Sequence, residues 1–245
     1  MRYYPVLLDI EGRPCVVIGG GKVAERKAVG LIEAGALVTV ISPKATRKLK
    51  DLAQKGAIEH IKRGYRKGDL SGAFLAVSAA DSKAVNASAC MEASRSNILL
   101  NAVDDPGNCN FIIPSSFRRG PLVIAVSTSG KSPLLARALK ETLEEEIGRE
   151  YAVFTELLGA IRERLLKRGV ENGKKERIIK ALIKSPILRF IREGSLKEID
   201  FLLSRLLGNG VTLRRLGIRT KTQDAAAGGG LMNRRRLFIF SGGKF

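Results

Sequence analysis

The sequence predicts an α/β protein whose N-terminal part is a Rossmann domain with a parallel sheet. Apolar runs of strand length alternate with segments of helical periodicity over the first hundred residues. A glycine-rich turn, Gly19-Gly20-Gly21, separates the apolar run 15–18 from a helical segment that begins near Lys22. Beyond residue 150 the pattern is helical only, with expected helices at 151–167, 176–183 and 196–207. These observations indicate a nucleotide-binding domain followed by a helical C-terminal region.

The turn after the first strand matches the dinucleotide-binding fingerprint in its Ala-ending form, Gly19-x-Gly21-x-x-Ala24. Gly19 allows a tight turn, Gly21 lets the backbone approach a pyrophosphate, and Ala24 lets the helix pack close to the strand. The free N–H groups of the helix N-terminus attract phosphates. The motif alone is weak, but its context is right, because a second apolar strand at 36–41 follows the helix. The alternative is a Rossmann-like core without a ligand.

The end of the second strand departs from the usual NAD pattern. Ser42-Pro43-Lys44 stand where an Asp or Glu commonly binds the ribose hydroxyls. Ser42 can still hydrogen-bond a ribose, whereas Lys44 and Arg47 would suit a 2′-phosphate. The residues alone therefore leave NAD and NADP both open.

Composition narrows the class of protein. The 245 residues are 44% hydrophobic, and no apolar run approaches the roughly 18 residues of a membrane span. The N-terminus lacks the apolar region of a signal peptide, and the three cysteines have no metal-ligand spacing, so we expect a cytoplasmic protein without a membrane partner.

The chain is strongly basic, and the excess charge is uneven. The net charge is +19, with 22 basic and 16 acidic residues up to position 150 and 21 basic and 8 acidic residues after it. Nucleic acid, a polyanionic small molecule and a solvated basic tail each fit such a balance. Aromatic residues are only 5% and are not interleaved with basic ones, which argues against nucleic acid. From residue 210 onward we expect a largely disordered tail.

Two further places in the chain carry polar groups after predicted strands. The apolar run 98–103 ends at Asp104 and Asp105, where a carboxylate would lie near a bound nicotinamide, although both residues also suit a plain turn. His60, the only histidine, is expected at the surface with no catalytic role. After the strand 120–126 comes a hydroxyl-rich turn before a helix at 134–147, which is either an anion site or ordinary helix capping. The residues of that turn assigned to substrate binding are Ser127, Thr128, Ser129, Lys131 and Ser132.

These segments together resemble the precorrin-2 dehydrogenase family, the dehydrogenase/ferrochelatase module of sirohaem synthase. The resemblance covers about residues 1–150 and is carried by five stretches in family order. They are Tyr4-Pro5-Val6, Gly19-Gly20-Gly21-Lys22-Val23-Ala24-Glu25-Arg26-Lys27, Asn101-Ala102-Val103-Asp104-Asp105-Pro106, Phe111-Ile112-Ile113-Pro114-Ser115 and Ala125-Val126-Ser127-Thr128-Ser129-Gly130-Lys131-Ser132-Pro133.

The resemblance implies an NAD-dependent oxidation of precorrin-2 to sirohydrochlorin, with Fe²⁺ insertion in some members. It implies a homodimer whose domains are a Rossmann domain at 1–113, a dimerisation segment at 114–150 and a helical domain at 151–209, with the basic tail at 210–245. Asp104 matches the functional aspartate of the family, a proton acceptor. The implied nucleotide contacts are Lys22, Val23, Pro43 and Lys44, which join Gly19, Gly21, Ala24 and Ser42 in the cofactor site. Thr128 stands where some members carry a phosphorylated serine.

A function from another class also fits a Rossmann core, namely a nucleotide-sensing regulatory module without chemistry. Such modules usually keep the acidic residue after the second strand. They have no need for Asp104 together with the Ser127–Pro133 turn.

Overall fold

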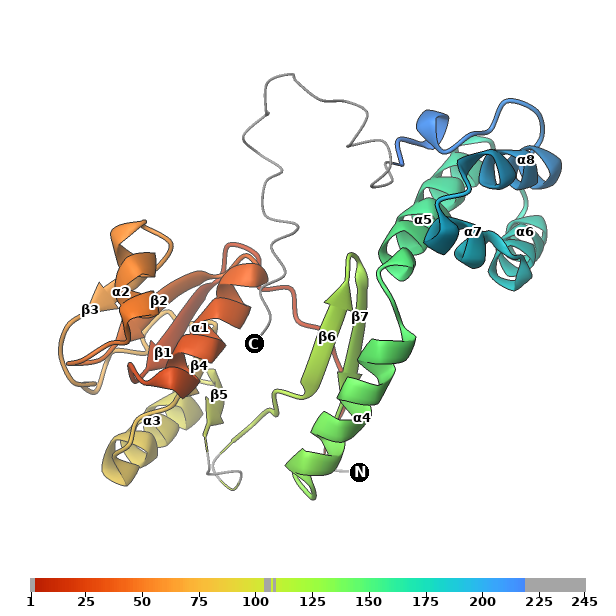
Figure 1. The fold of residues 1–245 in the computed structure, drawn as a ribbon. Helices are drawn as coiled ribbons and strands as arrows, with labels where there is room; N and C mark the ends of the chain where they lie inside the picture. The colour runs from red at the N-terminus through yellow and green to blue at the C-terminus, as the bar shows by residue number, and fades with distance from the viewer. Residues whose placement is uncertain (1–2, 104–106, 108, 219–245) are drawn as a thin grey trace. The chain divides into compact units, whose positions relative to one another are not determined.

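The computed structural model describes residues 3–103, 107 and 109–218 (Figure 1). Asp104 and the part of the expected tail 210–245 beyond residue 218 therefore lie outside the described residues. The chain forms two compact units. One comprises Met1–Ile113 with Thr128–Ser132, and the other comprises Pro114–Ser127 with Pro133–Phe245.

The first unit is built on a five-stranded sheet in the order β3-β2-β1-β4-β5, in which every pairing is parallel (Figure 1). Its strands are β1 (Pro14–Ile18), β2 (Leu37–Ile41), β3 (Glu59–Ile61), β4 (Leu75–Ser78) and β5 (Leu99–Ala102). The helices that connect them are α1 (Lys22–Glu33), α2 (Arg47–Gln54) and α3 (Lys83–Arg95). The predicted Rossmann fold with a parallel sheet is therefore confirmed.

Both faces of this sheet are covered, which explains why its central strands are continuous apolar runs. Cys15 and Val17 of β1 point to the face where α1 and α2 pack, whereas Val16 and Ile18 point to the face where α3 packs. The small residues Ala24 and Ala28 of α1 are fully buried. They let α1 lie close to the sheet, which is the packing role that the fingerprint assigns to Ala24.

The second unit begins with an antiparallel hairpin of β6 (Ser115–Arg119) and β7 (Leu122–Val126), against which α4 (Pro133–Glu146) packs. Arg119 ties the hairpin to the end of this helix by donating to the carbonyl oxygens of Glu144 and Ile147, each at 2.9 Å. We did not predict β6, because its sequence Ser-Ser-Phe-Arg-Arg has a single apolar side chain, Phe117, for the inner face.

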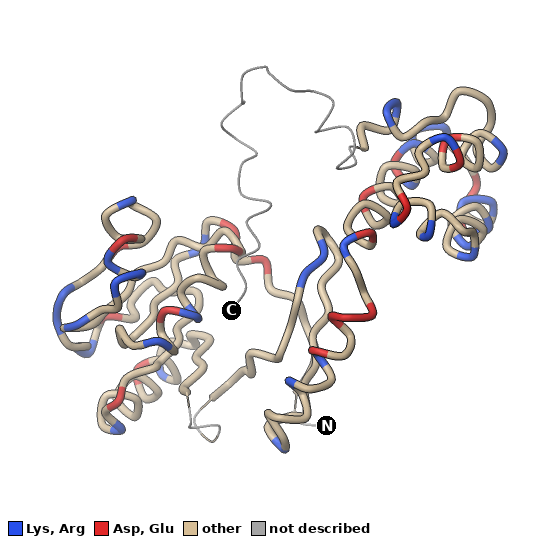
Figure 2. The backbone as a smooth tube through the Cα atoms, in the orientation of Figure 1, with Lys and Arg blue, Asp and Glu red and all other residues tan. Residues whose placement is uncertain are grey.

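The rest of the second unit is a helical bundle with its own apolar core. Its helices are α5 (Glu150–Lys167), α6 (Asn172–Lys184), α7 (Ile187–Glu193), α8 (Leu196–Leu207) and the short 3₁₀ turn η2 (Arg214–Leu216). Lys and Arg are distributed over both units, and both α4 and α5 carry acidic as well as basic residues (Figure 2).

The expectation that disorder begins at residue 210 is wrong for the stretch 211–218. Val211, Leu213 and Ile218 are buried in the core of the helical bundle. The Leu213 N–H also donates to Asp200 on α8 at 2.8 Å. Three apolar residues spaced among basic and polar ones have no recognisable periodicity in the sequence. They are buried because the helices of the bundle provide an apolar surface against which they pack.

Candidate cofactor site

The candidate site lies at the carboxyl edge of the sheet, where the strand order reverses: β2 and β3 lie on one side of β1, and β4 and β5 lie on the other. Backbone hydrogen bonds continue the ladder one residue past the strands: Gly19 N–H donates to Ile41 O at 2.9 Å, and Ala79 N–H donates to Ile18 O at 2.8 Å. The ends of β1, β2 and β4 are therefore held level. In open α/β sheets, ligands bind at this edge where the strand order reverses.

The three glycines of the turn have different surroundings. Gly19 has φ +117°, and a Cβ there would overlap the carbonyl oxygen of Ala79. A Cβ at Gly20 would overlap the carbonyl oxygen of Lys44 and lie 2.6 Å from Ser42 Oγ. A Cβ at Gly21 would have no atom of the described residues within 4 Å, apart from its neighbours in the chain. Gly19 and Gly20 are thus required by the protein's own packing, and only Gly21 leaves space for another molecule.

The helix that follows the turn offers an anion site. Gly21 is the N-cap of α1 in extended geometry, and no side chain caps the helix. Val23 is half-buried and Lys22 is exposed, with its ammonium 3.5 Å from the Glu25 carboxylate. The nearby Thr46 hydroxyl and, to a smaller extent, the Lys22 ammonium hold the pKa of the Glu25 carboxyl below its usual value.

These features fit the pyrophosphate of a dinucleotide. An uncapped helix N-terminus presents N–H groups and a positive dipole end. The open side of Gly21 gives the phosphate oxygens room to approach the backbone. Gly19, Gly21, Lys22, Val23 and Ala24 all lie on this turn or on the first turn of α1, and their contact with a cofactor stays a prediction.

The segment after β2 closes the other side of the turn. Thr46 N–H donates to Gly20 O at 3.0 Å, and Ser42 N–H donates to Ile61 O at 3.1 Å. Pro43 and Lys44 between them are exposed.

Ser42 and His60 differ from what we expected of them. Ser42 is buried, and the ring nitrogen Nε2 of His60 lies 3.1 Å from both its Oγ and its carbonyl oxygen. The Ser42 hydroxyl is thus enclosed by protein rather than offered to a ribose. His60 is half-buried on β3 and bonded, not a simple surface residue.

The proposed catalytic residue Asp104 is outside the described residues, but the chain on both sides of it is well anchored. Val103 N–H donates to Ser78 O at 2.8 Å, at the same carboxyl edge. The buried Cys109 thiol bonds the Ala102 backbone, and the Asn110 side chain bonds Leu100 N–H at 2.8 Å. The segment 109–110 therefore runs beside β5.

The hydroxyl-rich turn between β7 and α4 is organised by its own side chain. Thr128 Oγ1 accepts from Ser132 N–H and donates to Ser132 O, each at 3.0 Å. Ser129 and Gly130 adopt left-handed backbone conformations, with φ +54° and +82°. Ser127, Ser129 and Lys131 are exposed. The Thr128 hydroxyl thus serves to close the turn.

One residue that shapes the site escaped prediction. Asn86 of α3 is buried, accepts from Ser78 Oγ at 2.7 Å and donates to Ala80 O at 3.0 Å. It therefore fixes the turn after β4 whose Ala79 carbonyl faces Gly19. A polar residue on the inner face of a helix next to Ser78 is a recognisable signal, but only once the helix face is known.

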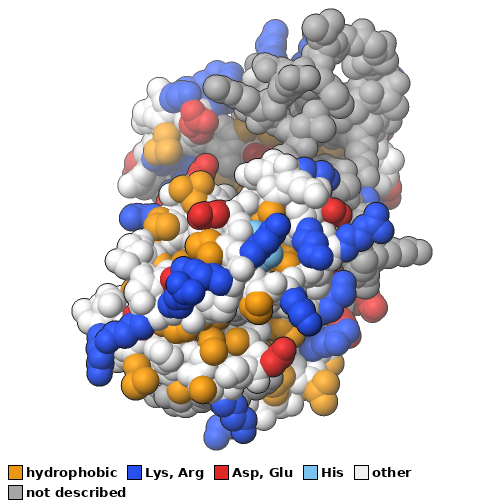
Figure 3. Space-filling view, turned by 90° about the vertical axis from the view of Figure 1, so that its left-hand side faces the viewer, with side chains coloured by type: hydrophobic (Ala, Val, Ile, Leu, Met, Phe, Trp, Pro, Cys, Tyr) orange, Lys and Arg blue, Asp and Glu red, His pale blue; other side chains and the backbone are white. Residues whose placement is uncertain are grey.

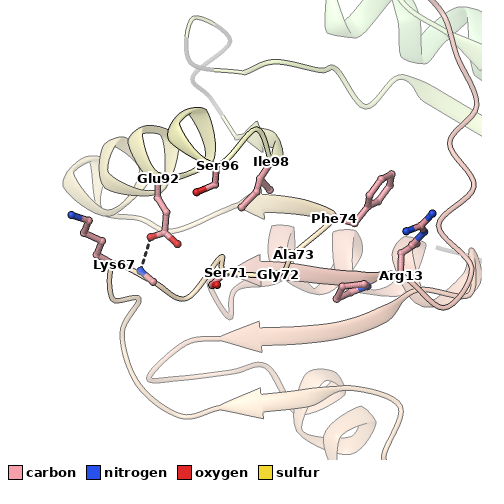
Figure 4. Close-up of a pocket in the computed structure, with 11 residues that line it drawn as sticks. Arg13, Lys67, Ser71, Gly72, Ala73, Phe74, Glu92, Ser96 and Ile98 are labelled. Atoms are coloured by element: carbon pink, nitrogen blue, oxygen red, sulfur yellow. Dashed lines mark hydrogen bonds between the residues drawn. The ribbon is translucent and has the colours of Figure 1, made fainter.

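A hollow of the Rossmann unit lies at the opposite edge of the sheet. It has a volume of about 760 Å³ and is lined by residues that precede β1, β4 and β5, including Arg13, Phe74 and Ile98 (Figure 4). Its one carboxylate, Glu92, already accepts from the N–H groups of Gly68 and Leu70, each at 2.8 Å. The hollow therefore reflects how the loop before β4 is tied down and is separate from the cofactor edge.

The described part of the chain has neither a candidate metal cluster nor a candidate membrane-spanning helix. Within it, no three His, Cys, Asp or Glu side chains are grouped closely enough to hold a metal ion. None of its helices combines the length and the apolar character needed to span a membrane.

Comparison with known proteins agrees with this architecture. Residues 6–115 match a family model described as "Putative NAD(P)-binding", and residues 119–146 match one described as "Sirohaem biosynthesis protein central". A siroheme synthase of Photobacterium profundum is 41% identical over 167 residues, which cover 68% of this chain and 36% of that protein. Siroheme synthase 1 of Pectobacterium atrosepticum is 32% identical over 94% of this chain and 48% of that protein. The chain thus spans less than half the length of these relatives.

A solved structure matches more completely. The protein described as "SirC, precorrin-2 dehydrogenase" superposes with a TM-score of 0.70 at 28% identity, over 83% of this chain and 98% of that one. The likeness therefore extends through both units, well past the glycine turn.

Proposed function

Because the chain belongs to the sirohaem-biosynthesis family of NAD(P)-binding proteins, we propose that it oxidises precorrin-2 to sirohydrochlorin with NAD⁺. The observation that supports this most directly is the glycine turn, with an uncapped helix N-terminus and open space at Gly21. A nicotinamide cofactor supplies the hydride acceptor when bound. The reaction then releases one proton, which a residue of the chain has to accept.

We assign that proton to Asp104. The assignment rests on the family resemblance and on the anchoring of Val103, the preceding residue, at the carboxyl edge. Aspartate is one of the usual general bases in enzymes. The chain's only histidine is not assigned this role, because it lies on β3 and is hydrogen-bonded to Ser42.

The polycarboxylate substrate requires positive or N–H-rich surface. We propose that the turn 127–132 binds its carboxylates, with Lys131 as the charged contact. Lys131 is exposed and is preceded by two residues in left-handed conformation, which bend the backbone sharply before α4. The Thr128 hydroxyl contributes by holding the turn closed.

We further propose that the protein works as a homodimer. Leu134, Leu135, Leu139 and Leu143 of α4 are exposed apolar side chains, and the last three are four residues apart, so they form a stripe along one face of the helix. An apolar helical stripe of this kind is usually covered by a partner. The three cysteines, all free of disulfides, fit a reducing compartment such as the cytoplasm.

The test is anaerobic turnover of enzymatically made precorrin-2 with NAD⁺, in which NADH formation and the sirohydrochlorin spectrum are followed together. We expect NADH from the parent chain. Asp104→Asn should lower turnover by about a hundredfold or more, the scale of a lost general base, with unchanged NADH binding. Asp105→Asn, next to it, is the matched control and should keep most of the activity.

The opposite pattern in the two variants would assign the proton transfer to Asp105. If the parent and both variants bind NADH equally well but the parent does not turn over precorrin-2, a nucleotide-sensing module would be favoured. Fe²⁺ added after NADH formation tests iron insertion, because the sirohydrochlorin spectrum then changes only if the metal enters the ring.

A further inference from the structure

The chain's single histidine lies beside the cofactor edge and is bonded there by a well-defined arrangement. His60 sits on β3, paired in register with Val40 of β2, and its Nε2 reaches across to Ser42 just past the end of β2. The two distances from Nε2, to Ser42 O and to Ser42 Oγ, are both 3.1 Å. The imidazole is only half-buried and shows as a small pale-blue area among Lys and Arg side chains (Figure 3).

The contact with the carbonyl oxygen indicates the tautomer of the ring. A carbonyl oxygen can only accept a hydrogen bond, so the 3.1 Å approach of Nε2 to Ser42 O is a hydrogen bond only with the hydrogen on Nε2. Nε2 then has no lone pair for the Ser42 hydroxyl, which can act only as a second acceptor from the same N–H. His60 is therefore a donor that holds the Ser42 peptide in place.

That peptide is the start of the segment that lies against the glycine turn. Lys44 O occupies the space that a Cβ at Gly20 would need, and Ser42 Oγ lies 2.6 Å from that Cβ position. Thr46 N–H closes the segment by donating to Gly20 O. The segment 42–46 is thus held at one end by His60 and at the other by Gly20.

The residues between these two anchors are the exposed Pro43 and Lys44, which belong to the proposed cofactor site. In a Rossmann unit of NAD enzymes, a carboxylate at the end of the second strand would bind the ribose directly. Here the equivalent hydroxyl of Ser42 is enclosed and bonded by His60. Recognition of the adenosine end then depends on where the backbone of residues 42–44 is held.

We propose that His60 is a positioning residue for the dinucleotide: by donating Nε2–H to Ser42 O, it holds residues 42–44 in the conformation that binds the adenosine ribose. This inference rests on the proposed cofactor site. It assigns His60 no contact with substrate and no part in proton transfer. Its effect is accordingly on cofactor affinity and not on the chemical step.

The first test measures the dissociation constant of NADH by fluorescence, together with kcat and the KM values for NAD⁺ and precorrin-2. His60→Leu removes the donor at similar size, and we expect NADH to bind about fivefold to tenfold more weakly, the scale of one lost hydrogen bond. The KM for NAD⁺ should rise in parallel, whereas kcat at saturating NAD⁺ and the KM for precorrin-2 should stay within about twofold, because the missing donor acts only on cofactor binding.

Two variants separate the hydrogen bond from general damage to the strand. His60→Gln keeps an N–H donor on a side chain of comparable reach and should recover most of the affinity. Glu59→Gln alters the neighbouring exposed residue on β3 and should bind NADH as the parent does. The inference is overturned if His60→Leu binds NADH as tightly as the parent, or if His60→Gln is as weak as His60→Leu.

A second measurement needs no variant. With ¹⁵N-labelled histidine the chain gives the signals of one imidazole only. In the neutral ring the hydrogen should be on Nε2, and the opposite tautomer would overturn the inference. NADH binding without precorrin-2 turnover would refute the proposed function alone, since neither the fluorescence titration nor the tautomer depends on that substrate.

Discussion

Replacing two adjacent glycines of the turn by alanine should have opposite consequences. A methyl at Gly20 would collide with the carbonyl oxygen of Lys44, so the backbone of one segment has to shift. Overpacking of this kind costs about 1–3 kcal/mol of folding stability. Gly20→Ala should therefore lower the free energy of unfolding by about that amount, and it should weaken NADH binding because the segment 42–46 moves.

Gly21→Ala should leave stability almost unchanged. Apart from its chain neighbours, no atom of the part of the chain that the structure describes lies within 4 Å of the methyl, and the backbone at φ −80° and ψ −174° is allowed for alanine. Alanine is a poorer N-cap than glycine, but it also restricts the unfolded chain by about 0.4–1 kcal/mol, so the two effects nearly cancel. The methyl instead enters the space for the pyrophosphate. Loss of one charge-assisted hydrogen bond, about 1.5–3 kcal/mol, would weaken NADH binding about tenfold to a hundredfold.

The assay is urea unfolding followed by circular dichroism, with an NADH fluorescence titration of the same preparations. Gly20→Ala should unfold at lower urea, and Gly21→Ala should unfold with the parent while binding NADH poorly. Equal destabilisation by both variants would show that Gly21 is also required by packing. Parent-like affinity of Gly21→Ala would show that no phosphate approaches the turn there.

Two further predictions concern residues outside the cofactor site. Burial alone would raise the pKa of the Glu92 carboxyl, but hydrogen bonds from the Tyr65 hydroxyl and from two backbone N–H groups outweigh it and lower the pKa. Glu92 therefore stabilises the fold at pH values above its unfolded pKa of about 4.3, and this contribution is lost as the pH falls through its lower folded pKa. The variant Glu92→Gln should be less stable than the parent at pH 7, and the difference in stability should shrink toward pH 3. Identical urea midpoints of parent and variant from pH 7 to pH 3 would contradict this. Leu139→Arg, in the exposed stripe of α4, should shift the protein from dimer to monomer in sedimentation velocity, whereas Leu166→Arg, an exposed leucine of α5, should not. A monomeric parent chain would refute the proposed interface.

The Rossmann half was predictable because local sequence decides its structure. Buried parallel strands must be apolar throughout, so Val16 to Ile18 and Leu75 to Val77 are recognisable without any partner. Gly19 is recognisable because its φ of +117° excludes other side chains. The helices of the second unit were recognisable for a similar reason, since their apolar residues recur at helical spacing.

What could not be predicted depends on contacts between distant segments. His60 shows nothing unusual in its neighbours Glu59 and Ile61, and only the pairing of β3 with β2 places it beside Ser42. The role of Asn86 was unpredictable for the same reason, because its hydrogen-bond partner Ser78 lies on another element. β6 was missed because Arg119 holds it through acceptors at the far end of α4, which its own sequence does not reveal.

The glycine turn itself shows why a fingerprint can outlast its ligand. Gly19 and Gly20 are required by Ala79 and Lys44 of the same protein, so a Rossmann unit that binds nothing would still keep them. Gly21 is different, since no protein atom of the described residues occupies the space beside it and an alanine would fold equally well. Its presence is therefore the part of the motif that a ligand explains and packing does not. By this reasoning the third glycine separates a cofactor-binding turn from a purely structural one, and the paired alanine variants decide which of the two this chain contains.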